Sequence, residues 1–330
     1  MLRAYATTNP VGGDAHFDVP LSNLAVSAFD VQSVDFVGDA LFPEVPVGKQ
    51  SDKYYVISKD GFLRVPDTYR APRTRARRVE FEISSNAYFA HNYALAAENA
   101  MEDLENADLA VNLRQNSSLL VVTGLRRDQE ARLANLCTSV SNLGSGALLS
   151  GATAWSDGTS DPLGAINTAH AFIRQRTGLV PNVAVIDYDT TMILRRHPQL
   201  LDLYKFTSGG ELTDAQLGQI LKVPRVLVGK GVRENQLEGT APGPAATSMT
   251  NIWGNNCLFA HVSPTPTGLQ TQTFGLRFRW RNPIYPGEFG VQTKVENGAG
   301  ERKVEVLEAG YFQDEKIVAT DLAYLIGTTL

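Results

Sequence analysis

The chain has 330 residues, which is enough for one large domain or two domains of medium size. Hydrophobic residues make up 43% and charged residues 20%, a composition typical of a globular protein and not of a disordered one. The formal charge of 30 − 35 = −5 argues against a protein that grips nucleic acid over its whole surface.

The sequence also lacks signals for export, membrane insertion or a disulfide framework. No apolar run approaches the roughly 18 residues of a membrane span, and the polar N-terminus has no signal-peptide core. We therefore expect a soluble protein made in the cytoplasm. The two cysteines, Cys137 and Cys257, have no metal-binding spacing and are expected to be small buried apolar residues.

Residues 1–50 contain four prolines and little periodicity, which indicates an extended arm. The apolar run LAVSAF at 24–29 and several later apolar residues are too many for a disordered tail, so the arm should pack on something else. Residues 51–83 read as a long hairpin. Its first strand is KYYVIS at 53–58, and the return strand is ARRVEFEI at 76–83.

The hairpin carries a basic excursion that cannot bury much surface on itself. It contains six arginines, Arg64, Arg70, Arg73, Arg75, Arg77 and Arg78. Three interpretations stay open: a solvated charged loop, an arm that meets acidic surfaces of neighbouring subunits, or a contact with nucleic acid. The last has the least support, because Tyr69 is the only aromatic residue among the arginines.

The sequence of residues 87–140 favours helical structure. A helix from 108 to 139 is expected, with Asp108 as its N-cap and a weak point at Gly124. A glycine-rich linker should follow at 141–160. Asp161 and Pro162 then open the clearest helix, which should end at Gly178.

An α/β module is predicted next, with buried strands at 181–187 and 225–229. Between these strands, Pro198 separates two short helices, and Thr213 with Gln216 forms a capping box. Residues 236–256 read as an exposed loop. Further strands are expected at 257–262, 273–280, 303–306 and 312–320.

The search for chemistry finds no reacting constellation. His16 lies between Asp14 and Asp18 in a metal-like pattern, but no further ligand is placed near it, so no metal site is predicted. The Gly-Lys at 229–230 lacks the glycine and Ser/Thr of a phosphate-binding loop. We predict no cofactor and no catalytic residue.

Asp187 and Asp189 are the best candidates for a site, because they follow a buried strand of the α/β module. A hydrolase or transferase would use such a strand end. The simpler interpretation is that Asp189 caps the helix that follows.

The order of these parts resembles the HK97-like major capsid proteins of tailed bacteriophages. The resemblance rests on the extended loop with its return at 51–95 and on the stretches 155–206 and 210–231. It implies an α+β fold with five parts. These are an N-terminal arm (1–50), an extended loop (51–83), a peripheral domain with a long spine helix (84–160), an axial domain (161–310) and a returning C-terminal strand (311–330).

The family further implies a structural protein that forms pentamers and hexamers of an icosahedral head around double-stranded DNA, without enzymatic activity. Expected partners are other copies, a separate scaffolding protein, a portal, a decoration protein and, loosely, the packaged DNA. The arm begins almost at Met1, so any proteolytic processing should be minor. Lys53 and Lys59 lie near the loop, but no crosslink between subunits is predicted. An encapsulin-type compartment remains the alternative with the same fold.

Overall fold

The fold is that of a computed structural model. It describes residues 16–17, 36–57, 63–80, 82–106, 112–203, 212–234, 249–265, 271–281, 290–297 and 303–328. The chain divides into two compact units, each built from separate stretches. Unit 1 comprises residues 1–34, 91–128 and 280–313, and unit 2 comprises residues 35–90, 129–279 and 314–330. The five predicted parts are consecutive stretches of the chain, whereas each of these units combines separate stretches. The division into units therefore does not test the boundaries of the five parts, which remain predictions.

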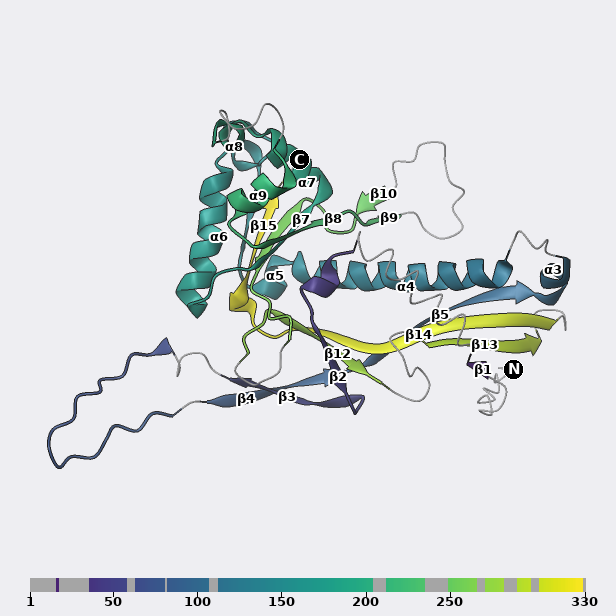
Figure 1. The fold of residues 1–330 in the computed structure, drawn as a ribbon, viewed down its shortest axis with the longest axis horizontal. Coiled ribbons are helices and arrows are strands. Elements are labelled where there is room, and N and C mark those ends of the chain that lie inside the picture. Colours follow the sequence, from purple (N-terminus) through teal and green to yellow (C-terminus); the bar gives the residue numbers. More distant parts are fainter. Residues whose placement is uncertain are drawn as a thin grey trace, which may run out of the picture. The chain divides into compact units, whose positions relative to one another are not determined.

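Unit 1 is a set of antiparallel strands with a helix packed on them. Strand β14 pairs with β13 on one side and with β5 on the other, and β13 also pairs with β1. The elements are β1 (His16–Phe17), β5 (His91–Ala100), α3 (Met101–Asn106), the first part of α4 (Leu113–Cys137), β13 (Gly290–Asn297) and most of β14 (Lys303–Ile317). Helix α4 buries Val121, Val122 and Leu125 against Leu307 and Tyr311 of β14. Figure 1 shows this helix running beside the strands.

Strand β5 corrects the prediction that the whole of 87–140 is helical. Its residues pair with β14 from His91 opposite Gln313 to Ala100 opposite Val304. This long-range pairing overrides the helical preference of its alanines, because propensity is a weak signal beside tertiary contacts. The strands predicted at 303–306 and 312–320 likewise form one strand, β14, that ends at Ile317.

Helix α4 begins at Leu113 and runs unbroken to Cys137, so the predicted weak point at Gly124 does not interrupt it. Gly124 serves packing instead. A Cβ atom at this position would lie 3.0 Å from the Leu95 side chain of β5, so the glycine lets the strand approach the helix closely. The predicted cap Asp108 lies outside the described residues.

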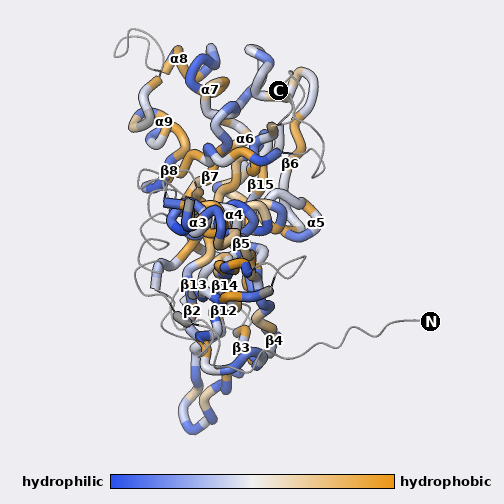
Figure 2. The backbone as a smooth tube through the Cα atoms, turned by 90° about the vertical axis from the view of Figure 1, so that its right-hand side faces the viewer, coloured by the Kyte–Doolittle hydropathy of each residue, from blue (hydrophilic) through white to orange (hydrophobic). Residues whose placement is uncertain are grey.

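Unit 2 is built around a five-stranded sheet in the order β6-β15-β11-β7-β8. Its strands are β6 (Gly146–Leu149), β7 (Val183–Asp187), β8 (Arg225–Gly229), β11 (Asn256–Ala260) and β15 (Ala323–Thr328). Strands β6 and β15 are parallel, as are β7 and β8. The hydrophobic colour of the tube in Figure 2 is concentrated along strands such as β7 and β15.

The predicted linker at 141–160 is therefore wrong, because it supplies α5 (Val140–Leu143) and the edge strand β6. Strand β6 pairs with β15, which lies far along the chain and could not be seen from local composition. After η2 (Gly151–Thr153), Trp155 is buried, and its backbone N–H donates to Thr328 Oγ1 at 3.0 Å.

Four helices bury a common apolar cluster on one face of this sheet: α6 (Pro162–Thr177), α7 (Tyr188–Arg196), α8 (Pro198–Leu203) and α9 (Asp214–Leu221). Their predicted caps are confirmed. Asp161 Oδ1 accepts from Gly164 N at 3.0 Å, Gly178 ends α6 in the left-handed conformation, and Thr213 and Gln216 form the capping box. Pro198 begins α8 directly after α7, as expected.

The opposite face packs on a second apolar cluster that includes Leu133, Phe42 and Trp253. On the central strand β11, Leu258 belongs to this cluster and its neighbours Cys257 and Phe259 to the first, so the strand is buried on both faces. Cys137 and Cys257 are both buried, as predicted. The smaller elements are η1 (Gly38–Ala40), β2 (Glu44–Val47), β9 (Val232–Glu234), β10 (Met249–Asn251), β12 (Gly275–Trp280) and η3 (Thr320–Leu322).

Truncation of Leu133 should reveal how much this second cluster contributes to stability. Leu133 is fully buried, so Leu133→Ala should lower the free energy of unfolding by about 2–5 kcal/mol through lost contacts and a residual cavity. The matched control is Leu120→Ala on the same helix, where the side chain is 68% exposed. That variant should change stability by less than about 0.5 kcal/mol in urea unfolding. Equal losses for both variants would contradict the packing described.

Candidate assembly surfaces

A two-stranded ribbon carries the predicted extended loop. Strand β3 (Ser51–Ile57) pairs antiparallel with β4 (Ile83–Phe89), from Ser51 opposite Phe89 to Ile57 opposite Ile83. The first predicted strand is confirmed. The predicted return strand at 76–83 is wrong, because residues 76–80 are not paired and β4 begins at Ile83. The register is fixed at the base, where Ala90 N donates to Gln50 O at 2.8 Å.

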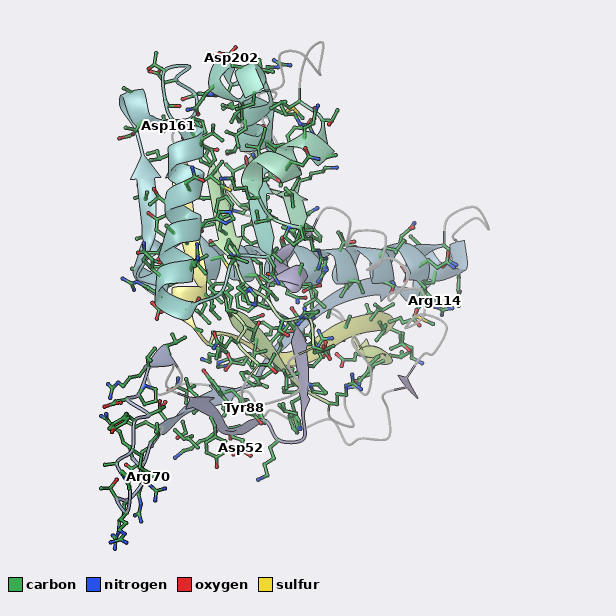
Figure 3. The ribbon with its side chains drawn as sticks, turned by 60° about the vertical axis from the view of Figure 1, so that its left-hand side comes forward. Asp52, Arg70, Tyr88, Arg114, Asp161 and Asp202 are labelled. Carbon is green, nitrogen blue, oxygen red and sulfur yellow. The ribbon has the colours of Figure 1, made fainter. Side chains whose placement is uncertain are left out.

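Aromatic packing holds the base of the ribbon to the rest of unit 2. The Tyr88 ring stacks on Phe278 of β12 with centroids 4.7 Å apart, and Tyr54 lies 5.0 Å from the same ring. Phe89 N also donates to Asp314 Oδ2 at 2.9 Å. Figure 3 shows Tyr88 at this base and Arg70 far along the excursion. These contacts hold the ribbon at its base, and Leu63 of the excursion also lies near Gly178, where an added Cβ would be 3.6 Å from Leu63 Cδ2.

We call residues 63–80 the arginine segment. Leu63 is helical, and Thr74 N donates to Ala71 O at 3.2 Å in a turn. The rest of the segment has no regular secondary structure. All six predicted arginines lie in it and all are exposed: Arg64, Arg70, Arg73, Arg75, Arg77 and Arg78. None of them forms an ion pair or side-chain hydrogen bond with another described residue. The fold thus gathers the six cations on one excursion without giving them a partner among the described residues.

Apolar side chains share this exposure. Val65 is 93% exposed, Tyr69 86% and Val79 66%. Single exposed apolar residues are ordinary, but these three, together with Leu63 at 48%, leave the excursion with little to hold its shape. Within the described part of the chain, the arginine side chains therefore have no counter-charge and these apolar side chains have little cover.

The second candidate site from the sequence is the pair Asp187 and Asp189 at the end of β7, and the contacts of this pair hold elements of the fold together. Asp187, not Asp189, caps α7, because its Oδ2 accepts from Asp189 N at 3.0 Å. Asn251 Nδ2 donates to Asp187 Oδ2 at 3.0 Å and to Asp189 Oδ2 at 2.8 Å. Burial raises the pKa of Asp187 to about 6, and the bond from Asn251 opposes that shift. These contacts tie β10 to the start of α7.

A further buried carboxylate, Glu130 of α4, was not anticipated from the sequence. Its Oε1 accepts from Val37 N at 2.9 Å and from Trp253 Nε1 at 2.6 Å, and its Oε2 accepts from Gly38 N at 3.0 Å. Burial raises the pKa of Glu130, while these hydrogen bonds pull the pKa down. No sequence signal identifies it, since it stands among charged helix residues that look solvent-facing.

Two arginines of β12 hold the stretch of chain that comes directly after Gly38. Arg277 pairs with Asp39 and lies 3.7 Å from Glu44 Oε2, and Arg279 Nη1 lies 3.3 Å from the same carboxylate. Because both guanidinium groups are almost fully buried, each needs such a counter-charge. Residues 39–44, which lead into the ribbon, are thereby fixed.

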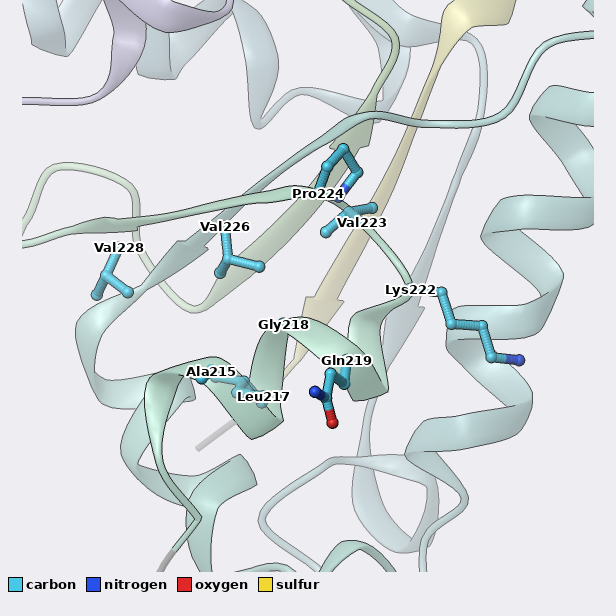
Figure 4. A pocket seen from close by; sticks show the side chains of 9 residues that line it. All are labelled: Ala215, Leu217, Gly218, Gln219, Lys222, Val223, Pro224, Val226 and Val228. Atoms are coloured by element: carbon cyan, nitrogen blue, oxygen red, sulfur yellow. The ribbon is translucent and has the colours of Figure 1, made fainter.

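The remaining candidates bring little chemistry together. Asp14 and Asp18 lie outside the described residues, as does Lys59, while Lys53 is exposed on β3. Over the described ranges, no group of three His, Cys, Asp or Glu residues could hold a metal ion. Among the same residues no helix is both long and apolar enough to span a membrane. An open groove of about 700 Å³ lies between α9 and β8 (Figure 4).

Comparison with known proteins gives relatives over most of the chain. No family model matches it. The chain is 27% identical over 292 residues to the major capsid protein of Pseudomonas phage JBD67, and the aligned part covers 87% of this chain and 90% of that protein. It is also 27% identical over 318 residues to the major capsid protein of Burkholderia phage BcepMu, covering 94% and 95% respectively.

Solved structures share the fold. A phage-related protein of Bordetella bronchiseptica RB50 matches with a TM-score of 0.70 and 22% identity, over 94% of this chain and 96% of that one. The capsid of cyanophage P-SCSP1u matches with a TM-score of 0.58 and 12% identity, over 89% and 88%. The predicted α+β fold of the HK97-like capsid proteins is therefore confirmed.

The raised pKa of Asp187 predicts a pH-dependent contribution to stability. A carboxyl with a folded-state pKa of about 6 and an unfolded value near 3.8 stabilises the protein most when protonated. That contribution is present below about pH 4 and is lost as the pH rises through about 6. Asp187→Asn keeps a good helix cap but cannot titrate, so the stability difference between wild type and variant should shrink or reverse across this window.

Thermal unfolding of both proteins at several pH values between 4 and 7 measures this difference. Parallel curves of melting temperature against pH would contradict the assignment. Asp161→Asn, at an exposed cap, is the control, and it should lack the same window because hydrogen bonds from Gln199 and Gly164 outweigh the effect of burial and lower the Asp161 pKa.

Proposed function

We propose that this chain, an HK97-like major capsid protein of tailed bacteriophages, forms pentamers and hexamers that close an icosahedral head around double-stranded DNA. The observation that carries the proposal is the arginine segment, in which every described residue except the partly buried Pro66 is exposed. Its place is the virion capsid, where other copies of the same chain supply what one copy lacks.

A shell needs lasting contacts of well over about 1,000 Å² between subunits. An excursion that reaches onto a neighbour gains such area from few residues. The contact is heterologous, meaning that two different surfaces of the subunit meet, so the arginines should face acidic groups elsewhere on the neighbouring copy. An acidic chain with one local cluster of cations meets this requirement.

Of the three interpretations of the arginines, the contact between subunits has the best support. A purely solvated loop does not explain the exposed Val65, Tyr69 and Val79 that alternate with the charges. A nucleic-acid contact would be expected to bring more stacking residues than Tyr69. The proposal therefore assigns Arg64, Arg70, Arg73, Arg75, Arg77 and Arg78 to assembly.

The proposal extends to the partners and the setting of assembly. A separate scaffolding protein, a portal and a decoration protein would act with the shell, which would touch the packaged DNA only loosely. Assembly would take place in the host cytoplasm. The role is structural, and the contacts of Asp187 and Asp189 with Asn251 support stability and not the alternative of a hydrolase or transferase.

Expression of the chain with its neighbouring head genes tests the proposal directly. Electron microscopy and light scattering should show rings or closed shells, because the arginine segment requires a neighbour. A strictly monomeric protein at high concentration, with and without a scaffolding protein, would overturn the proposal. Particles that enclose a cargo enzyme instead of DNA would indicate the encapsulin-type compartment.

Charge reversal tests the arginines. The variant Arg73→Glu, Arg75→Glu, Arg77→Glu and Arg78→Glu should fold normally, since these side chains are exposed and unpaired among the described residues, but should yield at least tenfold fewer particles. The matched control replaces the same four arginines with lysine, which keeps the charge and should retain much of the assembly. Circular dichroism confirms folding and sedimentation counts particles. Normal yields from the glutamate variant would make the segment a solvated loop.

A further inference from the structure

The five-stranded sheet of unit 2 has two open edges, and their surfaces differ in a way that matters for ring formation. Strand β6 ends the sheet on one side and β8 on the other, and neither pairs with a further strand among the described residues. Open edges offer unpaired backbone groups to other chains. A ring of identical subunits requires two different, complementary surfaces on each copy.

The β8 edge is bordered by an apolar groove. Leu217 of α9 and Val223, Pro224, Val226 and Val228 line it, and its volume is about 700 Å³. Figure 4 shows these side chains with the helix on one side and the strand on the other. At Gly218 an added Cβ would lie 3.7 Å from Val226, so the glycine keeps this part of the groove open. The exposed cations Lys222 and Arg225 flank it.

The β6 edge carries an exposed apolar side chain, and two carboxylates follow this strand in the chain. Leu148 is 73% exposed, whereas the other three residues of β6 are partly buried. The chain runs on through η2 to Asp157 and to Asp161, which Figure 3 labels at the start of α6. Local hydrogen bonds, from Thr159 and Gln199 respectively, lower the pKa of both carboxyls, so both are charged at neutral pH.

We propose that Leu148 of one copy packs into the α9–β8 groove of the next copy around each ring. The occupant is a second copy of this chain, because both edges present apolar side chains and the charges that go with them are of opposite sign. An exposed leucine on a strand followed by two carboxylates would meet an apolar groove flanked by two cations. Each copy offers one of each, so the contact repeats around the ring. This inference rests on the proposed shell function, and it names the surfaces by which rings form.

Disulfide trapping tests the contact in the assembled particle. The pair Leu148→Cys and Gln219→Cys places one thiol on each edge, while the native Cys137 and Cys257 are buried and should not react. Mild oxidation of particles should yield a ladder of covalent oligomers up to five or six chains on a denaturing gel. Each single variant should give no ladder. Particles that form normally but give no ladder would overturn the inference while leaving the shell function intact.

Substitution of Leu148 gives a second readout that does not depend on thiol geometry. Leu148→Asp should fold, since the side chain is exposed, but should lose ring formation at least tenfold. Leu148→Met is the matched control and should assemble, because methionine is of similar size and apolar. Analytical ultracentrifugation measures rings, and thermal unfolding checks the subunit. Equal assembly of both variants would refute the contact, whereas failure of the wild type to assemble at all would refute the proposed function instead.

Discussion

The hydrogen bonds to the buried carboxylate of Glu130 are the interaction on which the order of unit 2 depends. They join three stretches far apart in the chain: the segment at Val37 and Gly38, the end of α4, and Trp253. A carboxylate without such donors would be costly to bury, so the three stretches must arrive together. With residues 36–38 fixed, the arginines of β12 fix residues 39–44, and the aromatic contacts of Phe278 then fix the ribbon. The series of contacts that positions the base of the ribbon, and with it the start of the arginine segment, therefore begins at one buried acid, Glu130.

This arrangement separates what one copy can satisfy from what it cannot. The buried acids and arginines of unit 2 have their partners inside the unit, and both faces of its sheet are covered by apolar clusters. The arginine segment and the two sheet edges have no partner of this kind among the described residues. A subunit divided in this way leaves these surfaces uncovered within the described part of one copy. In the proposed shell, the contacts with a neighbour would not compete with those that fold the chain.

Local signals in the sequence predicted the elements whose stabilising contacts are also local. Asp161 with Pro162, Gly178, Pro198 and the pair Thr213 and Gln216 all act within a few residues, and the structure places each as expected. Prediction failed where a strand is set by a distant partner. Strands β5 and β6 pair with β14 and β15, more than a hundred residues away, and read locally as helix and linker. The cap of α7 was misplaced by two residues because a buried Asp187 and an exposed Asp189 look alike in sequence. The exposure of the arginines could be foreseen from their number and spacing, but the groove beside β8 depends on how α9 packs and could not.

The open, irregular backbone of the arginine segment has a consequence for the life of the free subunit. Proteases that cut after basic residues bind their substrates as extended chains, and this segment offers six such residues without any secondary structure to unfold first. In the proposed shell, an unassembled copy would therefore be the form most open to cleavage, because a neighbour that covers the segment would also shield it. Turnover of stray subunits and survival of finished shells can follow from the same stretch of chain.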